Sequence, residues 1–220
     1  METKKIWNLL CYNLSNLMNK EFSNLAPEDD FILIQSFLEG DRIAFERLIL
    51  RHKDRVYNLC FRFIGDNQDA DDLAQEVFIK VFKSLKKFRF QSSFSTWLYR
   101  ITINTCKNRI KSRDFRYRKM NVRGNRKEDS KDCAVFEIIE SKESPTISLE
   151  KKEKTRLIQD AINLLPIKQR EIIILKDIDG LSYDEVSKIT GCKLGTLKSR
   201  LSRARLELKK KLRGIERNGM

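Results

Sequence analysis

The sequence predicts an all-α protein with two small helical domains joined by a flexible linker. Apolar residues recur at helix spacing from about Pro27 to Arg118, and this periodicity then collapses until about Leu149. A second set of helical patterns follows, in which two short helices are separated by a glycine. A length of 220 residues fits one large domain or two small ones, and the interrupted pattern favours two.

The N-terminal domain is predicted over residues 27–115 and contains four helices. Apolar residues of the first helix end before Gly40, which suits a left-handed C-cap, and Asp41 suits the N-cap of the next helix. The second helix keeps one apolar face over residues 45–63 and stops at Gly65. The chain therefore turns sharply between successive helices of this domain.

The third helix of this domain is predicted in "DNQDADDLAQEVFIKVFKSL" and is acidic at its start. Its core side carries Leu73, Val77, Val81 and Leu85. The acidic side chains of its first turns are Asp69, Asp71, Asp72 and Glu76. The positive end of the helix dipole favours negative charge at this end.

The fourth helix is predicted in "FSTWLYRITINTCKNRIKSR". At about 100° per residue, one narrow stripe of its surface holds Thr96, Arg100, Asn104, Lys107 and Lys111. This stripe offers hydrogen bonds at one end and positive charge at the other.

Aromatic residues surround the start of this stripe. Trp97 lies in the helix, and Phe88, Phe90 and Phe94 lie in or beside the preceding loop. Aromatic rings stack on unpaired bases, and an amide such as that of Asn104 bonds to base edges. The residues leave two alternatives open: capture of a single strand of nucleic acid, or ordinary core packing of Trp97 and Tyr99.

The C-terminal domain is predicted over residues 149–213, after a linker at 116–148 and before a tail at 214–220. The linker segment "SKESPTIS" contains turn and breaker residues. Pro166 ends the first helix of this domain and lies in the first turn of the second.

A helix-turn-helix pattern follows. Ser182 and Glu185 form an S-x-x-E capping box, which predicts a helix over residues 183–190, and Gly191 makes the turn. The next helix is predicted to bury Leu194, Leu197, Leu201, Ala204 and Leu208. Its outward side chains are small or basic, namely Gly195, Thr196, Lys198, Ser199, Arg200, Ser202 and Arg203. This arrangement is typical of proteins that read duplex DNA, although a small helix with a solvated basic face has the same pattern.

The net charge of +14 is concentrated in two stretches. Residues 107–127 contain ten Lys or Arg and one acid, and residues 193–217 contain ten and two. The rest of the chain is slightly acidic. Two separate basic patches, each continuous with a predicted helix, favour two contacts with nucleic acid over a solvated surface or tail.

Enzymatic chemistry is disfavoured. The five cysteines are scattered without a C-x-x-C pair, and His52 is the single histidine, so neither a disulfide framework nor a zinc site is expected. We interpret His52 as structural or exposed. No glycine-rich phosphate loop occurs, so we expect no cofactor, and the free cysteines fit a reducing cytoplasm.

The first 26 residues form an N-terminal extension whose role the sequence does not decide. It has neither a cleavage site typical of a signal peptide nor the length of a membrane span, so no membrane insertion is expected. It fits an extra packing helix, a partner-binding tail or residues ahead of a true start at Met18.

Taken together, the blocks "DLAQEVF", "FSTWLYRI" and "LSYDEVSKITGCKLGTLKSRLSRARLELKKKL" closely resemble those of the extracytoplasmic-function (ECF) sigma factors of bacterial RNA polymerase, members of the sigma-70 superfamily. The resemblance covers roughly residues 28–115 and 150–212. It implies a sigma region 2 domain and a sigma region 4 domain, without the middle helical domain of larger sigma factors. The short linker agrees with this.

The resemblance implies three groups of functional residues. Those for the single-stranded minus-10 element are Arg89, Phe90, Gln91, Ser92, Trp97, Tyr99, Arg100, Asn104, Lys107, Asn108 and Lys111, with the loop from Arg89 to Ser93 selecting a flipped base. Those for the duplex minus-35 element are Thr196, Lys198, Ser199, Arg200 and Arg203. Those for the clamp helices of the largest core polymerase subunit are Asp69, Asp71, Asp72, Leu73, Gln75, Glu76 and Phe78.

The resemblance also implies partners. The earlier helices of the second domain would dock on the flap of the other large subunit, and the linker would thread toward the active centre. Promoter DNA and an anti-sigma factor are expected as further partners, with no small-molecule substrate and no bond chemistry by the chain itself.

Two positions depart from the family pattern. Many relatives have glycine and an acid where this chain has Phe90 and Gln91, which leaves the captured base undefined. A proline common before the recognition helix is Lys193 here, which reduces preorganisation at the helix start. The alternative function is a stand-alone helix-turn-helix regulator with a partner-binding first domain, which leaves the acidic helix and the aromatic stripe unexplained.

Overall fold

The computed structural model describes residues 29–112 and 145–218, with the side chains of the second range described from 154 to 215. Every regular element in these ranges is helical, which confirms the predicted all-α class. The elements of the first domain are α2 (Asp30–Glu39), α3 (Arg42–Ile64), α4 (Asn67–Ser84), the 3-10 turn η2 (Leu85–Lys87) and α5 (Phe94–Lys111). Those of the second are α7 (Pro145–Asn163), α8 (Ile167–Ile173), the π-helical turn η3 (Ile174–Ile178), α9 (Tyr183–Thr190) and α10 (Leu194–Asn218).

The sharp turns of the first domain arise from short-range capping. Gly40 ends α2 with a φ of 113°, a conformation that glycine adopts without steric cost. Asp41 then accepts a hydrogen bond from the backbone N–H of Ile43 at 2.8 Å and starts α3. Asp66 does the same for α4, accepting from the N–H of Asp69 at 2.8 Å. The predicted boundary between the first two helices is therefore confirmed.

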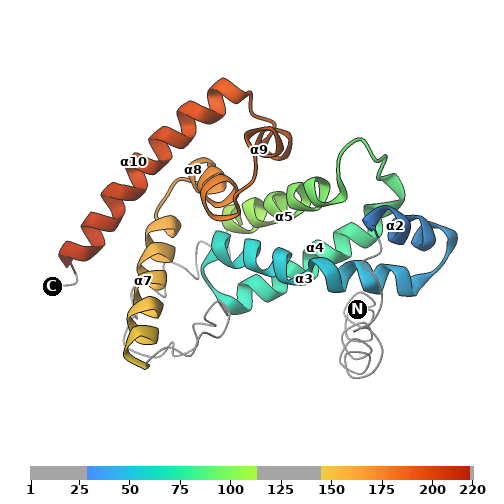
Figure 1. Cartoon of the computed structure of the whole chain (residues 1–220), viewed down its shortest axis with the longest axis horizontal. Helices are drawn as coiled ribbons and strands as arrows, with labels where there is room; N and C mark the ends of the chain where they lie inside the picture. Colours follow the sequence, from blue (N-terminus) through green and yellow to red (C-terminus); the bar gives the residue numbers. More distant parts are fainter. Residues whose placement is uncertain (1–28, 113–144, 219–220) are drawn as a thin grey trace.

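The first domain buries one core among α3, α4 and α5, with α2 packed on α3 (Figure 1). Side chains that are almost fully buried come from each of these helices, including Ile34, Leu48, Phe63, Leu73 and Leu98. Their spacing matches the apolar periodicity of the sequence. One long face of α5 remains outside this core, on the side where the second domain lies.

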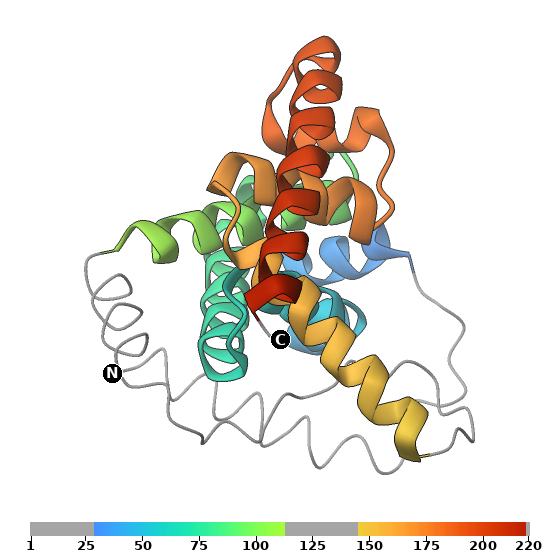
Figure 2. The same ribbon diagram turned by 90° about the vertical axis from the view of Figure 1, so that its left-hand side faces the viewer.

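In the second domain, α10 packs against α7 and α8, and Figure 2 shows α10 upright in front of α8. The predicted core positions Leu197, Leu201 and Ala204 are buried, and Leu208 is partly buried. The prediction for Leu194 is wrong, because its side chain is 43% exposed. Leu194 is the first residue of α10.

The predicted domain borders differ from the helices at one place. Helix α7 begins at Pro145, four residues before the expected start of the second domain. Proline is favoured in the first turn of a helix because its missing N–H has no partner there anyway, so this breaker residue starts the helix. The predicted extension at 1–26 and most of the predicted linker lie outside the described residues.

The two domains meet at the C-terminal end of α3. The guanidinium of Arg170, in α8, donates to the carbonyl oxygen of Phe63 at 2.6 Å and also to the carbonyls of Asn163 and Leu165. Gln159, in α7, donates to the carbonyl of Arg62 at 3.0 Å. Two carbonyls that the last turn of α3 leaves unpaired thus find donors in the other domain.

The environment of Arg170 is dry and crowded. Burial lowers the pKa of its guanidinium to about 10, which still leaves it charged at neutral pH. Beside it, Gly65 closes α3 with a φ of 77°, and a Cβ at that position would meet the amide of Asn163 at 2.0 Å. The positive φ therefore favours glycine here, and a larger residue would also displace the Asn163 side chain.

We expect Arg170→Leu to lower the free energy of unfolding by about 1.5–3 kcal/mol, because hydrogen bonds from a charged donor to buried carbonyls are lost. Urea denaturation followed by circular dichroism measures this. Arg156→Leu, at an exposed position of α7, is the matched control and should change stability by about 0.5 kcal/mol or less. Equal stability of the two variants would contradict the role assigned to Arg170.

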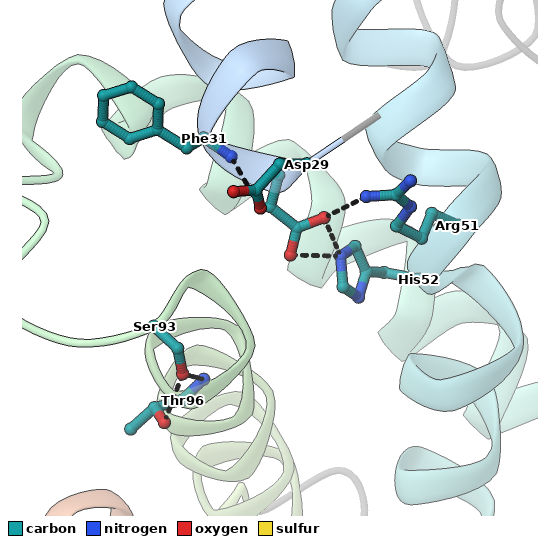
Figure 3. A network of polar contacts seen from close by, with 7 residues as sticks. Asp29, Phe31, Arg51, His52, Ser93 and Thr96 are labelled. Carbon is teal, nitrogen blue, oxygen red and sulfur yellow. Dashed lines mark hydrogen bonds and ion pairs between the residues drawn. The ribbon is translucent and has the colours of Figure 1, made fainter. Parts of the chain in front are cut away.

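The histidine ties α2 to α3. His52 is buried, and its Nε2 lies 3.0 and 3.1 Å from the two carboxylate oxygens of Asp30, while Arg51 donates to the same carboxylate at 3.0 Å (Figure 3). Burial alone would raise the pKa of Asp30, but its interactions with His52 and Arg51 outweigh this and lower it. The interpretation of His52 as structural agrees with these contacts.

We expect Asp30→Ala to destabilise the protein by about 1–3 kcal/mol at pH 7, because buried His52 loses its partner. Since the folded-state pKa of Asp30 lies below its ordinary value of 3.8, its contribution is present above that pH and is lost on acidification below it. The difference between parent and variant in urea unfolding should therefore shrink below pH 3.8.

The control is Arg51→Ala, which removes only the partly exposed partner of Asp30 and should cost about 1 kcal/mol or less. A difference between Asp30→Ala and parent that stays constant through the acid range would show that the carboxylate is not the source of the stabilisation.

Candidate nucleic-acid and polymerase interfaces

The predicted stripe of α5 is present on one side of the helix. Arg100, Asn104 and Lys111 are exposed, and Lys107 is partly buried. Thr96 is not available, because its side chain is buried. It contacts the capping hydroxyl of Ser93, whose Oγ lies 2.8 Å from the Thr96 Oγ1 and accepts from the Thr96 N–H at 3.2 Å (Figure 3). Asn108 is exposed near the stripe.

The two aromatic residues of α5 differ in exposure. Tyr99 is only 7% exposed, and burial together with the charge of Asp179 raises the pKa of its hydroxyl to about 12. Trp97 is partly buried and stacks on Phe88 and Phe94, with ring centroids 5.1 and 5.8 Å apart. The packing alternative thus describes Tyr99, whereas Trp97 keeps an exposed part.

The loop before α5 presents a second aromatic surface. Phe90 is 40% exposed and has a φ of 55°, which is uncommon for a residue other than glycine. Its ring lies between those of Phe31 and Phe88, each with a centroid 4.8 Å away. Glycine adopts this left-handed conformation without steric cost. Arg89 and Gln91 beside it are exposed, and Ser92 is partly buried.

Phe31 is one of the apolar residues that recur at helix spacing in α2, yet it is 45% exposed. It lies at the start of α2, far along the chain from the loop whose ring it contacts. A helical apolar pattern gives no sign of such a contact. The exposed aromatic pair Phe31 and Phe90 is therefore known only from the structure.

The acidic helix α4 separates into exposed and buried parts. Asp71, Asp72 and Glu76 are exposed, while Leu73 and Phe78 are buried in the domain core and can only support that surface from beneath. The remaining predicted side chains have partners in the fold. Asp69 pairs with Arg109 of α5 at 2.7 Å, and Gln75 donates to Asp71 at 3.0 Å.

The helix-turn-helix is built as predicted. The Ser182 hydroxyl accepts from the N–H of Glu185 at 3.2 Å, the Glu185 carboxylate accepts from the N–H of Ser182 at 2.8 Å, and Gly191 is left-handed. These hydrogen bonds also lower the pKa of Glu185. The predicted reading side chains lie on the free face of α10: Thr196, Lys198, Ser199 and Arg203 are exposed, and Arg200 is partly buried.

Two contacts hold basic side chains of α10 against the preceding helix and turn. The guanidinium of Arg200 lies 2.9 Å from the Cys192 sulfur. The Lys198 ammonium lies 5.8 Å from the centre of the Tyr183 ring. Neither Cys192 nor Tyr183 stood out in the sequence, because a thiol and a ring at helix spacing are ordinary packing residues.

The described ranges contain neither a candidate metal site nor a candidate membrane span. Within them, no group of three His, Cys, Asp or Glu side chains is placed to hold a metal ion. Cys60 and Cys106 are buried free thiols whose sulfurs are 3.8 Å apart. No helix in the described part of the chain has the length and apolar character to cross a membrane.

Comparison with known families matches both domains. The family Sigma-70 region 2 matches residues 48–116, and the family Sigma-70, region 4 matches residues 155–208. The first match covers most of α3 and all of α4 and α5. The second covers the last part of α7, all of α8 and α9 and most of α10.

Similar proteins span nearly the whole chain. The RNA polymerase sigma-H factor of Pseudomonas aeruginosa is 36% identical over 196 residues, which are 88% of this chain and 98% of that protein. The ECF RNA polymerase sigma-E factor of Escherichia coli K12 is 34% identical over 188 residues, or 86% and 96% of the two chains. The chain belongs to the ECF sigma factors of the sigma-70 family.

Solved structures show the same fold. CnrH, in complex with the cytosolic domain of CnrY, has a TM-score of 0.59 at 23% identity, with 85% of this chain and 99% of that chain covered. The sigma factor RpoE of Bartonella quintana, in complex with the anti-sigma factor NepR, has a TM-score of 0.53 at 26% identity, with 77% and 96% covered.

Family membership defines the class of function. The protein is an RNA polymerase sigma factor, a transcription initiation factor that binds core polymerase, recognises promoter DNA and promotes its melting. The alternative of a stand-alone helix-turn-helix regulator is not favoured, because the first domain is itself a sigma region 2 domain.

Proposed function

We propose that α5 and the loop before it bind the unpaired minus-10 strand. The stripe side chains Arg100, Asn104, Lys107 and Lys111 would contact base edges and phosphates, and Trp97 with Phe90 would stack on bases. The observation that carries this proposal is the pairing of an exposed amide and cation stripe with exposed aromatic rings at its start. Duplex DNA has no free base faces for such rings.

The second part of the proposal concerns the duplex. The free face of α10, with Thr196, Lys198, Ser199, Arg200 and Arg203, would lie in the major groove of the minus-35 element. Small side chains near the start of α10 permit a close approach, and Arg or Lys reach guanine edges or phosphates. The two DNA contacts therefore belong to separate domains.

The third part concerns the polymerase. The exposed acids Asp71, Asp72 and Glu76 of α4 would meet the clamp helices of the largest core subunit, with Gln75 beside them. Leu73 and Phe78 would keep this surface in place from within the core, and the pairing of Asp69 with Arg109 would fix α4 against α5. The earlier helices of the second domain would dock on the flap of the other large subunit.

We further propose that the chain acts in the cytoplasm and catalyses no bond change itself. Melting would use binding energy for the exposed bases, so no cofactor and no small-molecule substrate are required. An anti-sigma factor is proposed as a partner, supported by the anti-sigma complex of the RpoE structure that is 26% identical.

Co-elution and transcription test the function directly. The purified chain should co-elute with core RNA polymerase on a sizing column and direct a transcript from a promoter that core alone ignores. Variants in which Asp71, Asp72 and Glu76 are changed to Lys should lose co-elution. A chain that transcribes no promoter with core would remove the basis of the proposal.

We expect Asn104→Ala to reduce promoter opening by up to about tenfold, because one net hydrogen bond to an exposed base contributes ~0.5–1.5 kcal/mol. Permanganate reactivity of promoter thymines measures the opened fraction. Duplex binding by the second domain should change little. Gln35→Ala, which removes an exposed amide from α2, is the matched control, and equal reactivity of the two variants would refute the role of Asn104.

We expect Arg200→Ala to weaken binding to minus-35 duplex by about 1–3 kcal/mol, the usual contribution of a bidentate base contact. Arg213→Ala removes an exposed cation from the far part of the same helix and should affect all sequences alike. Fluorescence anisotropy with holoenzyme and labelled promoter fragments measures both. Unchanged promoter affinity of the Arg200 variant would overturn this assignment.

A further inference from the structure

The second domain contacts the cations of the minus-10 face with its own oxygen atoms. The Lys107 ammonium pairs with the Glu171 carboxylate of α8 at 2.5 Å. The Arg100 guanidinium donates to the carbonyl oxygen of Lys188, in the last turn of α9, at 2.5 Å. Glu171 is a carboxylate, and the Lys188 carbonyl lies at the C-terminal end of α9, which is the negative end of the helix dipole.

A third cation of this face comes from α3. Arg62 forms an ion pair with Asp179, the residue that follows the π-helical turn η3. Tyr99 shares a hydrogen bond with the same carboxyl group, and Arg55 acts on it electrostatically. Arg62 was not singled out in the sequence, because it belongs to the solvent side of an amphipathic helix. It lies beside the start of α5 and extends the cationic face.

The acids of this interface lose water when the domains meet. The side chains of Asp179 and Glu171 are each only 6% exposed. Burial raises the pKa of both carboxyl groups above their ordinary values, although the neighbouring cations oppose that rise. Polar groups that would be well solvated in separated domains are thus held at the contact.

The interface is also incompletely packed. A cavity of about 660 Å³ lies between α3, the start of α5, η3 and α9. It is lined from the first domain by Arg55, Asn58 and Arg62, among others, and from the second by Asp179 and Glu185. On the side of α5, the contact is therefore built from ion pairs around an open cavity, and such a contact separates more readily than an apolar core.

While α5 and α9 are in contact, the two domains cannot bind the minus-10 and minus-35 elements of one promoter at the same time. By their names, the minus-10 and minus-35 elements are about 25 base pairs apart, or roughly 85 Å of duplex at 3.4 Å per base pair. Helices α5 and α9 are in direct contact here, and α9 is the neighbour of α10 in the helix-turn-helix (Figure 1). The second domain must therefore leave α5 before the two elements are bound together.

We infer that Arg62 is a further phosphate-binding residue for the unpaired promoter strand, and that Asp179 occupies its phosphate position while the domains are closed. Carboxylate and phosphate oxygens bind guanidinium groups in the same way, so one replaces the other. The inference rests on the proposed function of α5 and extends the single-strand site to α3. Separation of the domains removes the second-domain acceptors of Arg62, Arg100 and Lys107 together.

The first part of the inference is that Asp179 blocks the phosphate position of Arg62. A charge reversal at Asp179, which separates the domains by repulsion, tests it. In Asp179→Lys, an ammonium faces Arg62 and Arg55 and repels them. Asp177→Lys is the matched control, because it changes the same charge in η3 at a residue that pairs with Arg205 inside the second domain. Anisotropy of a short fluorescein-labelled oligothymidylate with the full chain should show Asp179→Lys binding at least about fivefold tighter than Asp177→Lys, since more of the chain is binding-competent.

Equal affinity of these two variants, or no binding by Asp179→Lys, overturns the inference. Glu171→Lys, which opposes Lys107, opens the same interface by another pair and should give the same gain. If circular dichroism shows that Asp179→Lys is unfolded, the affinity of Glu171→Lys for the oligonucleotide tests the inference in its place.

The second part of the inference is that Arg62 binds a phosphate of the unpaired strand. Removal of Arg62 in the Asp179→Lys variant tests it. Adding Arg62→Ala to Asp179→Lys should abolish most of the gain and reduce the slope of log affinity against log salt by about 0.7, the value for one phosphate of a single strand. Arg51→Ala, on the same helix but paired with Asp30, should leave the slope unchanged. An unchanged slope in the Arg62 variant overturns the phosphate assignment.

A further variant separates this inference from the proposed function of α5. Adding Asn104→Ala to Asp179→Lys should weaken oligonucleotide binding without changing the salt slope. If Asn104→Ala has no effect and Arg62→Ala does, the α5 site fails while the phosphate contact stands. The reverse result retains the α5 site and rejects the contact at Arg62.

Discussion

The relation between the two domains depends on the buried guanidinium of Arg170. It binds carbonyl oxygens at the ends of α3 and α7 together, while Gln159 binds a third carbonyl one residue earlier in α3. Unpaired carbonyls at helix ends are costly when buried, so the second domain completes the hydrogen bonding of the first at the end of α3. Because α3 also packs against α5, this junction fixes which side of α5 faces the second domain.

The same cations serve two arrangements of the chain. With the domains together, Arg62, Arg100 and Lys107 bind a carboxylate, a helix-end carbonyl and another carboxylate. With the domains apart, the same groups face solvent and suit a polyanion. In this protein of net charge +14, the carboxylates of Asp179 and Glu171 thus occupy the cations that would bind DNA phosphates.

Local signals predicted much of the fold because they act over a few residues. The capping box of Ser182 and Glu185 and the left-handed turn at Gly40 are present as predicted. Long-range contacts were not predictable: Arg170 and Phe63 are 107 residues apart, and no pattern links them. For the site, the stripe of α5 and the free face of α10 followed from helix geometry. The burial of Phe78 did not, because a family motif does not distinguish residues that contact a partner from buried residues beneath them. Leu73 lay on the predicted core side of its helix, and core packing of Tyr99 was one of the two alternatives left open.

The loop before α5 has one more consequence. Phe90 holds a left-handed backbone between two other rings, where glycine would adopt the same conformation without steric cost. A glycine loop would also sample many other shapes, and DNA would have to select one of them. With phenylalanine, that loss of conformational entropy occurs when the protein folds, so the loop meets an incoming base with its shape already set.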